Sequence, residues 1–385
     1  MDGYLSGAAS QLMERGRVLT AKIPRDLPRD YDTLAQTCRK RINIQLEHLH
    51  AMADDPLLRE SKYQPERFRL FKRIVAELDI IETVGIAALD RANSDDHKLN
   101  ELLERIAREI HYPLETPVVT TLSQQYFHIY PDMNLLCVPL TEGRFLLHLP
   151  DLYHELAHPL LSAQNDPIVE PFQAQFLSAL SDALKYVSTE KSKEDRRRGP
   201  RQPGYLLQIW EIAWVKYWMT EFFCDLFAAY TLGPAFAWSH FHLAAKRGSD
   251  PFHVPINRST SHPADDARMR AILHALDISR FKDQAAKVHE CWRSYLLQCA
   301  ARPEPEYHRC YPDHLIRTIA ERTRDGVIGM QARICSEDTK DPIHALLNEA
   351  WIKFWAAPDC YVTWEKQAVN RLFDSRSPTP TIHDS

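Results

Sequence analysis

The chain has 385 residues, a formal net charge of −5 at pH 7 and 26% charged residues. This length can bury one large hydrophobic core or two, and the acidic balance argues against a dedicated nucleic-acid binder. Glycine is sparse, at 11 residues, and long stretches are rich in Leu, Ala, Glu, Lys and Arg, which is typical of a mostly helical protein.

The pattern of apolar residues and cysteines predicts a cytoplasmic protein. The eight cysteines are scattered without a Cys-x-x-Cys pair, which favours a reducing compartment over a disulfide framework. The first twenty residues lack the apolar segment of a signal peptide. The most hydrophobic stretch, residues 209–238, is interrupted by charged residues, so we expect a buried helix pair and no membrane span. The oligomeric state is not indicated.

The N-terminal part of the chain has the periodicity of amphipathic helices. Residues 31–53 and 65–111 carry apolar residues three and four positions apart. We therefore expect residues 1–112 to form a helical bundle, to which no chemistry is assigned.

The next part of the chain has a different composition, with segments rich in strand-forming residues separated by prolines. Residues 116–121, 126–130 and 135–139 are rich in β-branched and aromatic side chains, and they predict a small sheet of about three strands. Pro139 predicts that its segment is an edge strand or the end of a strand, because proline cannot donate to a sheet.

The rest of the chain returns to helical patterns. We expect helices at 171–188 and 206–231 and within 264–370. Between the first two, residues 190–203 predict a charged loop broken by proline. The fold class is therefore α+β, predominantly helical, with a small mixed or antiparallel sheet. The predicted parts are an N-terminal helical region (1–112), a core (113–275), a C-terminal helical region (276–374) and a flexible tail (375–385).

The residues that carry chemistry begin with the run His154-Glu155-Leu156-Ala157-His158. On a helix, positions i and i+4 share a face, so both imidazoles point the same way and can bind one Zn²⁺ ion at about 2.0–2.1 Å. Glu155 is placed to take a proton from metal-activated water. The alternative is a surface helix with unrelated histidines, but the apolar flanks favour a semi-buried site. Pro159 should bend this helix.

A second apolar helix offers the third ligand that a catalytic zinc site needs. Glu221 and Asp225 lie four residues apart among phenylalanines. Burying two carboxylates costs several kcal/mol unless each has a strong partner. Zinc would be the partner of Glu221, and Asp225 could accept the N–H of a zinc-binding imidazole and so fix its tautomer. The alternative is two acids on a polar stripe.

This combination resembles the gluzincin metallopeptidases, which join His-Glu-x-x-His on one helix to Glu-x-x-x-Asp on a later one. The resemblance implies His154, His158 and Glu221 as ligands, Glu155 as general base and Asp225 as a supporting residue. It also implies a zincin-like core in which the sheet lies beside the helix pair of the active site.

A third segment, Ser259-Thr260-Ser261-His262-Pro263 followed by Arg268, resembles a segment of soluble relatives of the HtpX-like and CAAX prenyl peptidases. This likeness implies that His262 lies near the active site and that Arg268 helps to hold the ligand helix. His262 is the first candidate to stabilise the oxyanion, with Tyr217 and Tyr230 as alternatives. The resemblance also implies that residues 133–140 bind an extended substrate by strand addition; an ordinary structural edge strand is the alternative.

Together the motifs predict a zinc-dependent metallopeptidase with one Zn²⁺ ion. It would hydrolyse bonds in a peptide or protein substrate, with Glu155 as general base. Two alternatives stay open. One is a catalytically silent or regulatory protein-binding module on the same fold, and the other is a zinc amidase that acts on a non-peptide substrate.

Overall fold

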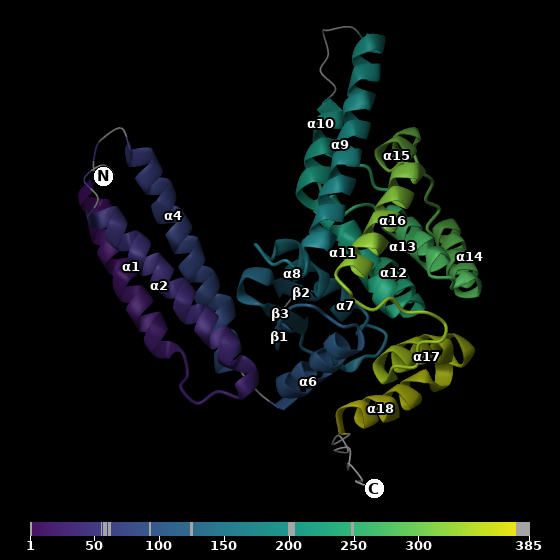
Figure 1. Ribbon diagram of the computed structural model, residues 1–385, viewed down its shortest axis with the longest axis horizontal. Helices are drawn as coiled ribbons and strands as arrows, with labels where there is room; N and C mark the ends of the chain where they lie inside the picture. The colour runs from purple at the N-terminus through teal and green to yellow at the C-terminus, as the bar shows by residue number, and fades with distance from the viewer. Residues whose placement is uncertain are drawn as a thin grey trace. The chain divides into compact units, whose positions relative to one another are not determined.

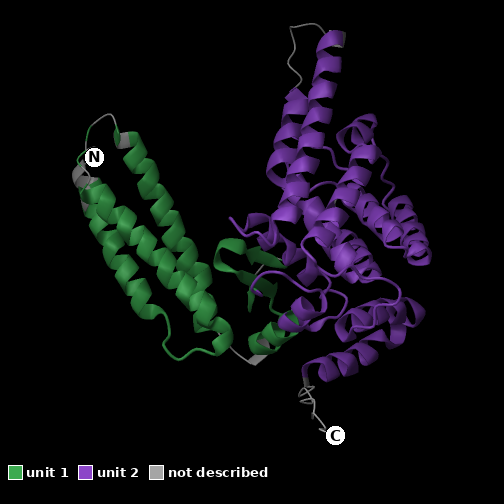
Figure 2. Ribbon diagram, viewed as in Figure 1, with its two compact units in different colours: residues 1–103, 117–140 green, residues 104–116, 141–385 purple. Residues whose placement is uncertain are grey.

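A computed structural model describes residues 2–54, 56, 60, 63–91, 94–123, 126–198, 205–247 and 250–374. The chain forms two compact units: unit 1 comprises residues 1–103 and 117–140, and unit 2 comprises residues 104–116 and 141–385 (Figure 2). The protein is predominantly helical with a small mixed sheet, which confirms the coarse fold prediction. The boundaries at 112, 275 and 374 stay predictions, and the tail of residues 375–385 lies outside the described residues.

Unit 1 is built from long helices that lie side by side (Figure 1). Apolar residues on one stripe of α2, such as Leu34, Cys38, Ile42 and Leu49, are fully buried, so the helix is held by packing of one face. The α- and π-helices described in this part of the chain are α1 (Asp2–Lys22), α2 (Asp32–Asp54), α4 (Gln64–Ile80), a π-helix (Ile81–Ile86), α5 (Ala87–Asp90) and α6 (Ser94–Glu109).

The three predicted strands are present: β1 (Val118–Ser123), β2 (His128–Tyr130) and β3 (Leu135–Pro139). Their order is β1-β3-β2, with β1 parallel and β2 antiparallel to β3. The central strand is therefore β3, and the prediction of an edge strand is wrong, although Pro139 does end the strand. The uninterrupted apolar run at 135–138 is the signal of a strand buried on both faces.

The central position of β3 also overturns one functional prediction. Strand addition needs an unpaired edge, but β3 is hydrogen-bonded to a neighbour on each side. Residues 133–140 are therefore not a site where an extended substrate adds as a strand.

Unit 2 is helical and is organised around α11 (Met219–Leu232), which packs against α7, α8, α9, α12, α13 and α16. Apart from Thr220 and Glu221, every residue of α11 is buried, as expected of a helix that is apolar all round. The other helices are α7 (Asp151–Glu155), α8 (Ala157–Ser162), α9 (Glu170–Arg198), α10 (Tyr205–Ala213), a π-helix (Trp214–Trp218), α12 (Pro234–Arg247), α13 (Asp265–Ile278), α14 (Lys282–Gln298), α15 (Pro305–Cys310), α16 (Asp313–Gly329), α17 (Pro342–Ala356) and α18 (Pro358–Asp374).

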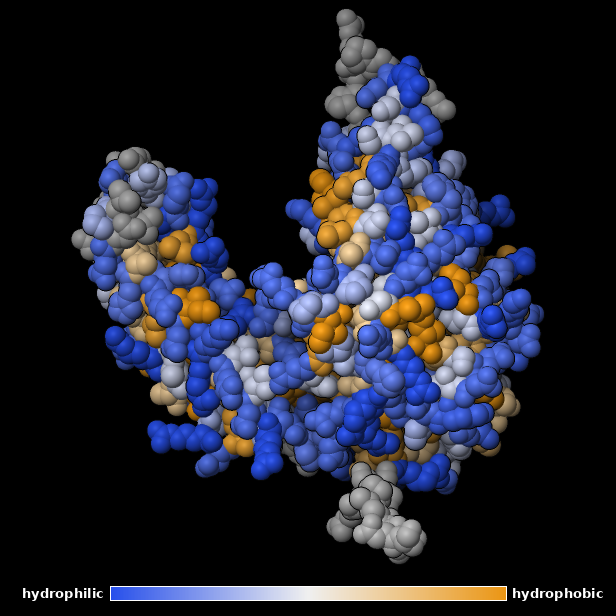
Figure 3. Space-filling view, in the orientation of Figure 1, coloured by the Kyte–Doolittle hydropathy of each residue, from blue (hydrophilic) through white to orange (hydrophobic). Residues whose placement is uncertain are grey.

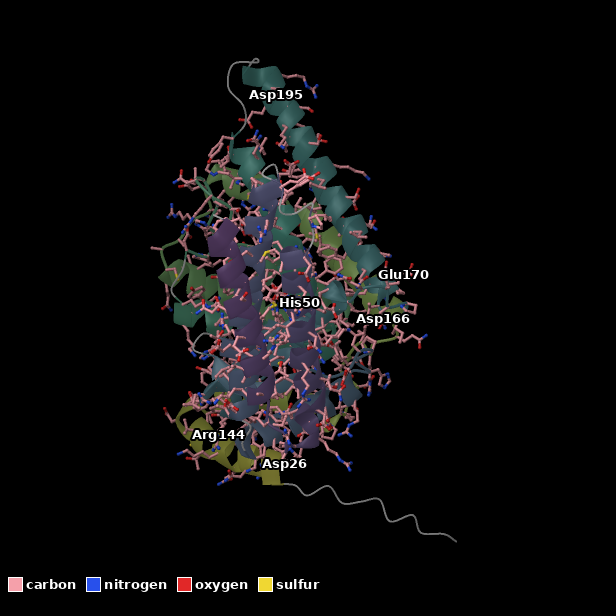
Figure 4. The ribbon with its side chains drawn as sticks, turned by 90° about the vertical axis from the view of Figure 1, so that its left-hand side faces the viewer. Asp26, His50, Arg144, Asp166, Glu170 and Asp195 are labelled. Carbon is pink, nitrogen blue, oxygen red and sulfur yellow. The ribbon has the colours of Figure 1, made fainter. Side chains whose placement is uncertain are left out.

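Helix α9 is longer than the sequence predicts. It continues without a break from Glu170 past Asp195, both labelled in Figure 4, so residues 190–198 are helical and not part of a loop. Arg309 of α15 stabilises this end of α9, because its guanidinium bonds Glu190 at 2.8 Å and Glu194 at 3.1 Å. The remaining predicted loop residues, 199–203, lie outside the described residues.

The helical segment that carries the two histidines is interrupted close to Pro159. Helix α7 ends at Glu155 and α8 begins at Ala157, with Leu156 between them. Proline has no N–H to donate to the carbonyl four residues earlier, which is that of Glu155. The break therefore falls between the two predicted zinc ligands.

The surface of unit 2 retains some apolar side chains. A hydrophobic patch lies over α10 in Figure 3, and the exposed residues of this helix include Tyr205 and Ile212. Among the residues that the structure describes, no helix is long and apolar enough to cross a membrane.

Candidate metal centre

The candidate centre lies where three segments of unit 2 meet. The short helices α7 and α8 and the first turn of α13 each pack against α11. Because α11 is buried and apolar on almost every side, its polar residues are held in place by their neighbours. The side chains predicted from the three separate sequence motifs are therefore brought together.

His154 is fixed by a buried carboxylate. Its Nδ1 lies 2.9 Å from Oδ1 of Asp225, which leaves Nε2 for another partner. Asp225 is fully buried and also accepts two hydrogen bonds of 2.6 Å from the Arg268 guanidinium. This bidentate pairing sets the orientation of the carboxylate and, through it, of the imidazole.

The same contacts determine the protonation states of Asp225 and His154. Burial alone would raise the pKa of Asp225, but the positive charge of Arg268 more than offsets it and holds this pKa far below its usual range. Burial alone would lower the pKa of His154, but the hydrogen bond and charge of Asp225, followed by the charges of Glu221 and Glu155, raise it to about 9. The environment of His154 therefore favours a positive charge at the ring.

Glu221 brings a carboxylate oxygen to this ring. Its Oε2 lies 3.6 Å from Nε2 of His154, 3.6 Å from Nε2 of His262 and 3.9 Å from the Arg268 guanidinium. The oxygen is buried, yet no described residue makes a hydrogen bond to it. Two ligands of a tetrahedral zinc ion, at 2.0–2.1 Å each, lie about 3.3 Å apart, so the first spacing fits a shared cation.

Among the described residues, the group whose three ligand atoms lie close enough to hold one metal ion differs from the predicted ligand set: it contains Cys224 in place of Glu221. His154, His158 and Cys224 offer ligand atoms that all lie within 4.8 Å of one another, so this group could hold a metal ion. Cys224 is fully buried, and burial, reinforced by the charges of Glu221 and Glu155, raises the pKa of its thiol well above the usual value. The thiolate form is therefore costly unless a cation stabilises it.

Glu155 and His158 complete the centre. Glu155 is 7% exposed, and its Oε2 lies 4.0 Å from Nε2 of His158. The rings of His154 and His158 remain neighbours in spite of the interruption of the helix, with centroids 5.2 Å apart. The carboxylate thus lies next to the two imidazoles, as the His-Glu-x-x-His spacing predicts.

The three candidates for stabilising an oxyanion are placed differently. His262 lies beside Glu221, and Ser261 Oγ is 2.9 Å from its Nδ1. Tyr217 is exposed on the π-helix that precedes α11. The Tyr230 hydroxyl is buried and donates to the Ala320 carbonyl at 2.8 Å, so donating to a substrate would require breaking that bond.

Two further residues complete the surroundings. Cys224 is three positions after Glu221, and this helical spacing is a signal that could have identified it. Phe236 of α12 stacks on His154, with ring centroids 6.3 Å apart, and no local pattern indicates this long-range contact.

The chain has no match among protein-family models, among curated proteins or among solved structures.

Proposed function

We propose that this protein is a zinc-dependent metallopeptidase. The observation that carries the proposal is the buried Oε2 of Glu221, which accepts no hydrogen bond from a described residue and lies 3.6 Å from Nε2 of His154. A buried carboxylate oxygen in this position is costly unless a cation stabilises it. A zincin-like core is part of the proposal.

The donor set suits zinc. His154, His158 and Glu221 offer two imidazole nitrogens and one carboxylate oxygen, a set that catalytic zinc sites use. Asp225 holds the tautomer of His154, and Arg268 holds Asp225. We prefer Glu221 to Cys224 as the third ligand, because its Oε2 is buried without a hydrogen bond from a described residue and lies 3.6 Å from Nε2 of His154.

In this proposal Glu155 moves the proton. Bound zinc supplies a Lewis acid that polarises a carbonyl and makes water a better nucleophile. The Glu155 carboxylate accepts the proton of the attacking water and returns it to the leaving amine. Its position beside both histidines, with little exposure to solvent, supports this role.

His262 is the group that we expect to stabilise the developing oxyanion. In this proposal Ser261 Oγ, 2.9 Å from Nδ1 of His262, is the donor, and the ring proton of neutral His262 is on Nε2, the atom next to Glu221. Burial lowers the pKa of His262, which keeps the ring neutral. An N–H at this point can donate to an oxygen that gains charge during the reaction.

The test compares peptide cleavage by the wild type and by Glu155→Gln. This substitution keeps the shape of the side chain but removes the base, so we expect cleavage to fall by about 10²–10⁴-fold while zinc content stays unchanged. The matched control is Glu304→Gln, an exposed residue before α15, which should cleave like the wild type.

The outcomes also separate the alternatives. A wild type that binds zinc but cleaves no member of a peptide library contradicts the peptidase proposal. In that case, hydrolysis of non-peptide amides would identify an amidase, and its absence would leave a binding module. Equal cleavage by the wild type and Glu155→Gln would contradict the role of Glu155.

A further inference from the structure

Unit 2 contains a cavity that is separate from the candidate metal centre. Its volume is about 460 Å³, within the range of pockets that hold small molecules. It lies between α12, α17 and the segment that leads into α17, and the start of α14 also lines it. None of the predicted zinc ligands lines this cavity.

The floor of the cavity is aromatic. Trp238, Phe281 and Trp351 line it and are at most 6% exposed. Trp238 and Trp351 stack with ring centroids 6.2 Å apart and an interplanar angle of 26°. Such a wall favours an apolar or aromatic group, and its ring faces also attract an ammonium.

The rim of the cavity is charged with both signs. Lys340, Glu337 and Glu349 line the cavity and are exposed. Within the described part of the chain, none of the three forms an ion pair. A ligand that carries both an ammonium and a carboxylate would be complementary to this rim.

One polar side chain of the wall lacks a hydrogen bond from the described residues. Trp351 is 1% exposed, and no described residue makes a hydrogen bond to its Nε1. The wall therefore retains an indole N–H that a ligand could use.

We propose that this cavity binds a free amino acid with an apolar side chain. Glu337 and Glu349 would bind its ammonium, Lys340 its carboxylate, and the aromatic floor its side chain. A capped peptide lacks both charges and fits the rim less well.

The cavity is connected to the helices of the metal centre. Asn348, which lines it, donates to the Leu232 carbonyl at the end of α11 and accepts from the Ala235 N–H at the start of α12. Glu221 lies on α11, and Phe236 of α12 stacks on His154. A bound amino acid would therefore change the rate of peptide cleavage, and this regulatory part rests on the proposed function.

The test is calorimetric titration of the full chain with L-phenylalanine up to about 10 mM. We expect saturable binding, weakened about tenfold or more for phenylalanine amide and for N-acetylphenylalanine, since each lacks one charge. Lys340→Met should weaken L-phenylalanine to the level of the amide in the wild type. The control is Lys353→Met, an exposed lysine of α17 that does not line the cavity.

Each result decides the proposal. Absence of binding, equal binding of the three compounds, or unchanged binding by Lys340→Met overturns it. Because binding requires no turnover, the titration is repeated with Glu155→Gln, which should bind L-phenylalanine like the wild type. Binding without peptidase activity would support the cavity and contradict the proposed function, whereas cleavage without binding would do the reverse.

Discussion

Two regions of unit 2 bury a histidine to the same extent but shift its pKa in opposite directions. His154 on α7 and His344 on α17 are both 8% exposed. Beside Asp225 the pKa of His154 is raised to about 9, although burial opposes this. At His344 burial lowers the pKa to about 4, and the charge of Asp341 opposes this only in part.

The difference shows that burial alone does not determine what a histidine can do. Burial favours a neutral ring, and a charged partner is needed to reverse that preference. The region of α7 and α11 supplies such partners and favours a positive charge at the ring, whereas the region of α17 keeps the ring neutral. We propose a metal ion for the former region and a small organic ligand for the latter.

We expect the largest effect on stability from Asp225→Asn, because it removes the charged partner that distinguishes His154 from His344. The substitution leaves the Arg268 guanidinium buried without its charged partner and makes the surroundings of His154 more like those of His344. We expect a loss of about 3–5 kcal/mol of unfolding free energy, measured by urea denaturation followed by circular dichroism. Asp195→Asn, at an exposed position of α9, is the control (Figure 4). Similar losses in the two variants would contradict the account.

This pairing illustrates what the sequence could predict. Spacing of four residues within an apolar helix was enough to select Glu221 and Asp225, because buried carboxylates require partners. The contact between His154 and Asp225 has the form that was predicted. The stacking of Phe236 on His154 joins distant segments, and no periodicity indicates it.

In the fold too, local sequence patterns predict some features, whereas others depend on contacts between distant segments. Apolar periodicity predicted most helices of both units, and β-rich composition predicted three strands. Strand order depends on pairing between segments, which is why β3 was misjudged. The charged end of α9 was read as a loop, because its stabilising partner Arg309 lies more than a hundred residues later.

The next prediction tests which residue of α11, Glu221 or Cys224, is the third zinc ligand. We expect Glu221→Ala to weaken zinc binding by more than about a hundredfold, since even supporting residues contribute about 10–100-fold. Cys224→Ser should change it by less than about tenfold, because the thiol is not the preferred ligand. Competition with a chromophoric chelator measures both affinities. The reverse order would assign the site to His154, His158 and Cys224.

The pH dependence of stability tests the region of α17. The folded-state pKa of His344 lies near 4, below the ordinary value of 6.5, so the folded protein disfavours the proton. The stability contributed by the neutral ring is present above pH 6.5 and is lost as the pH falls toward 4. From pH 7 to pH 5 this amounts to about 2 kcal/mol, measured by urea denaturation.

Two variants isolate this effect. His344→Phe should lose the pH-dependent component, whereas His289→Phe, at an exposed position of α14, should retain it. An unchanged pH dependence in His344→Phe would show that the ring is not kept neutral by burial.

The smallest change in unfolding free energy is expected at the interruption between α7 and α8. Pro159 lies in the first turn of α8, where an N–H would have no acceptor within that helix. Pro159→Ala should therefore change the unfolding free energy by less than about 1 kcal/mol, as should Pro305→Ala at the start of α15. A loss of more than about 3 kcal/mol of unfolding free energy in Pro159→Ala alone would show that the interruption of the helix itself stabilises the centre.

The central claim is that the region of α7 and α11 binds one zinc ion. Its most direct test is the zinc content of the purified full-length chain, determined by inductively coupled plasma mass spectrometry under non-chelating conditions. We expect one zinc per chain in the wild type and loss of that zinc in a His154→Ala, His158→Ala double variant. A wild-type chain without stoichiometric zinc would contradict it.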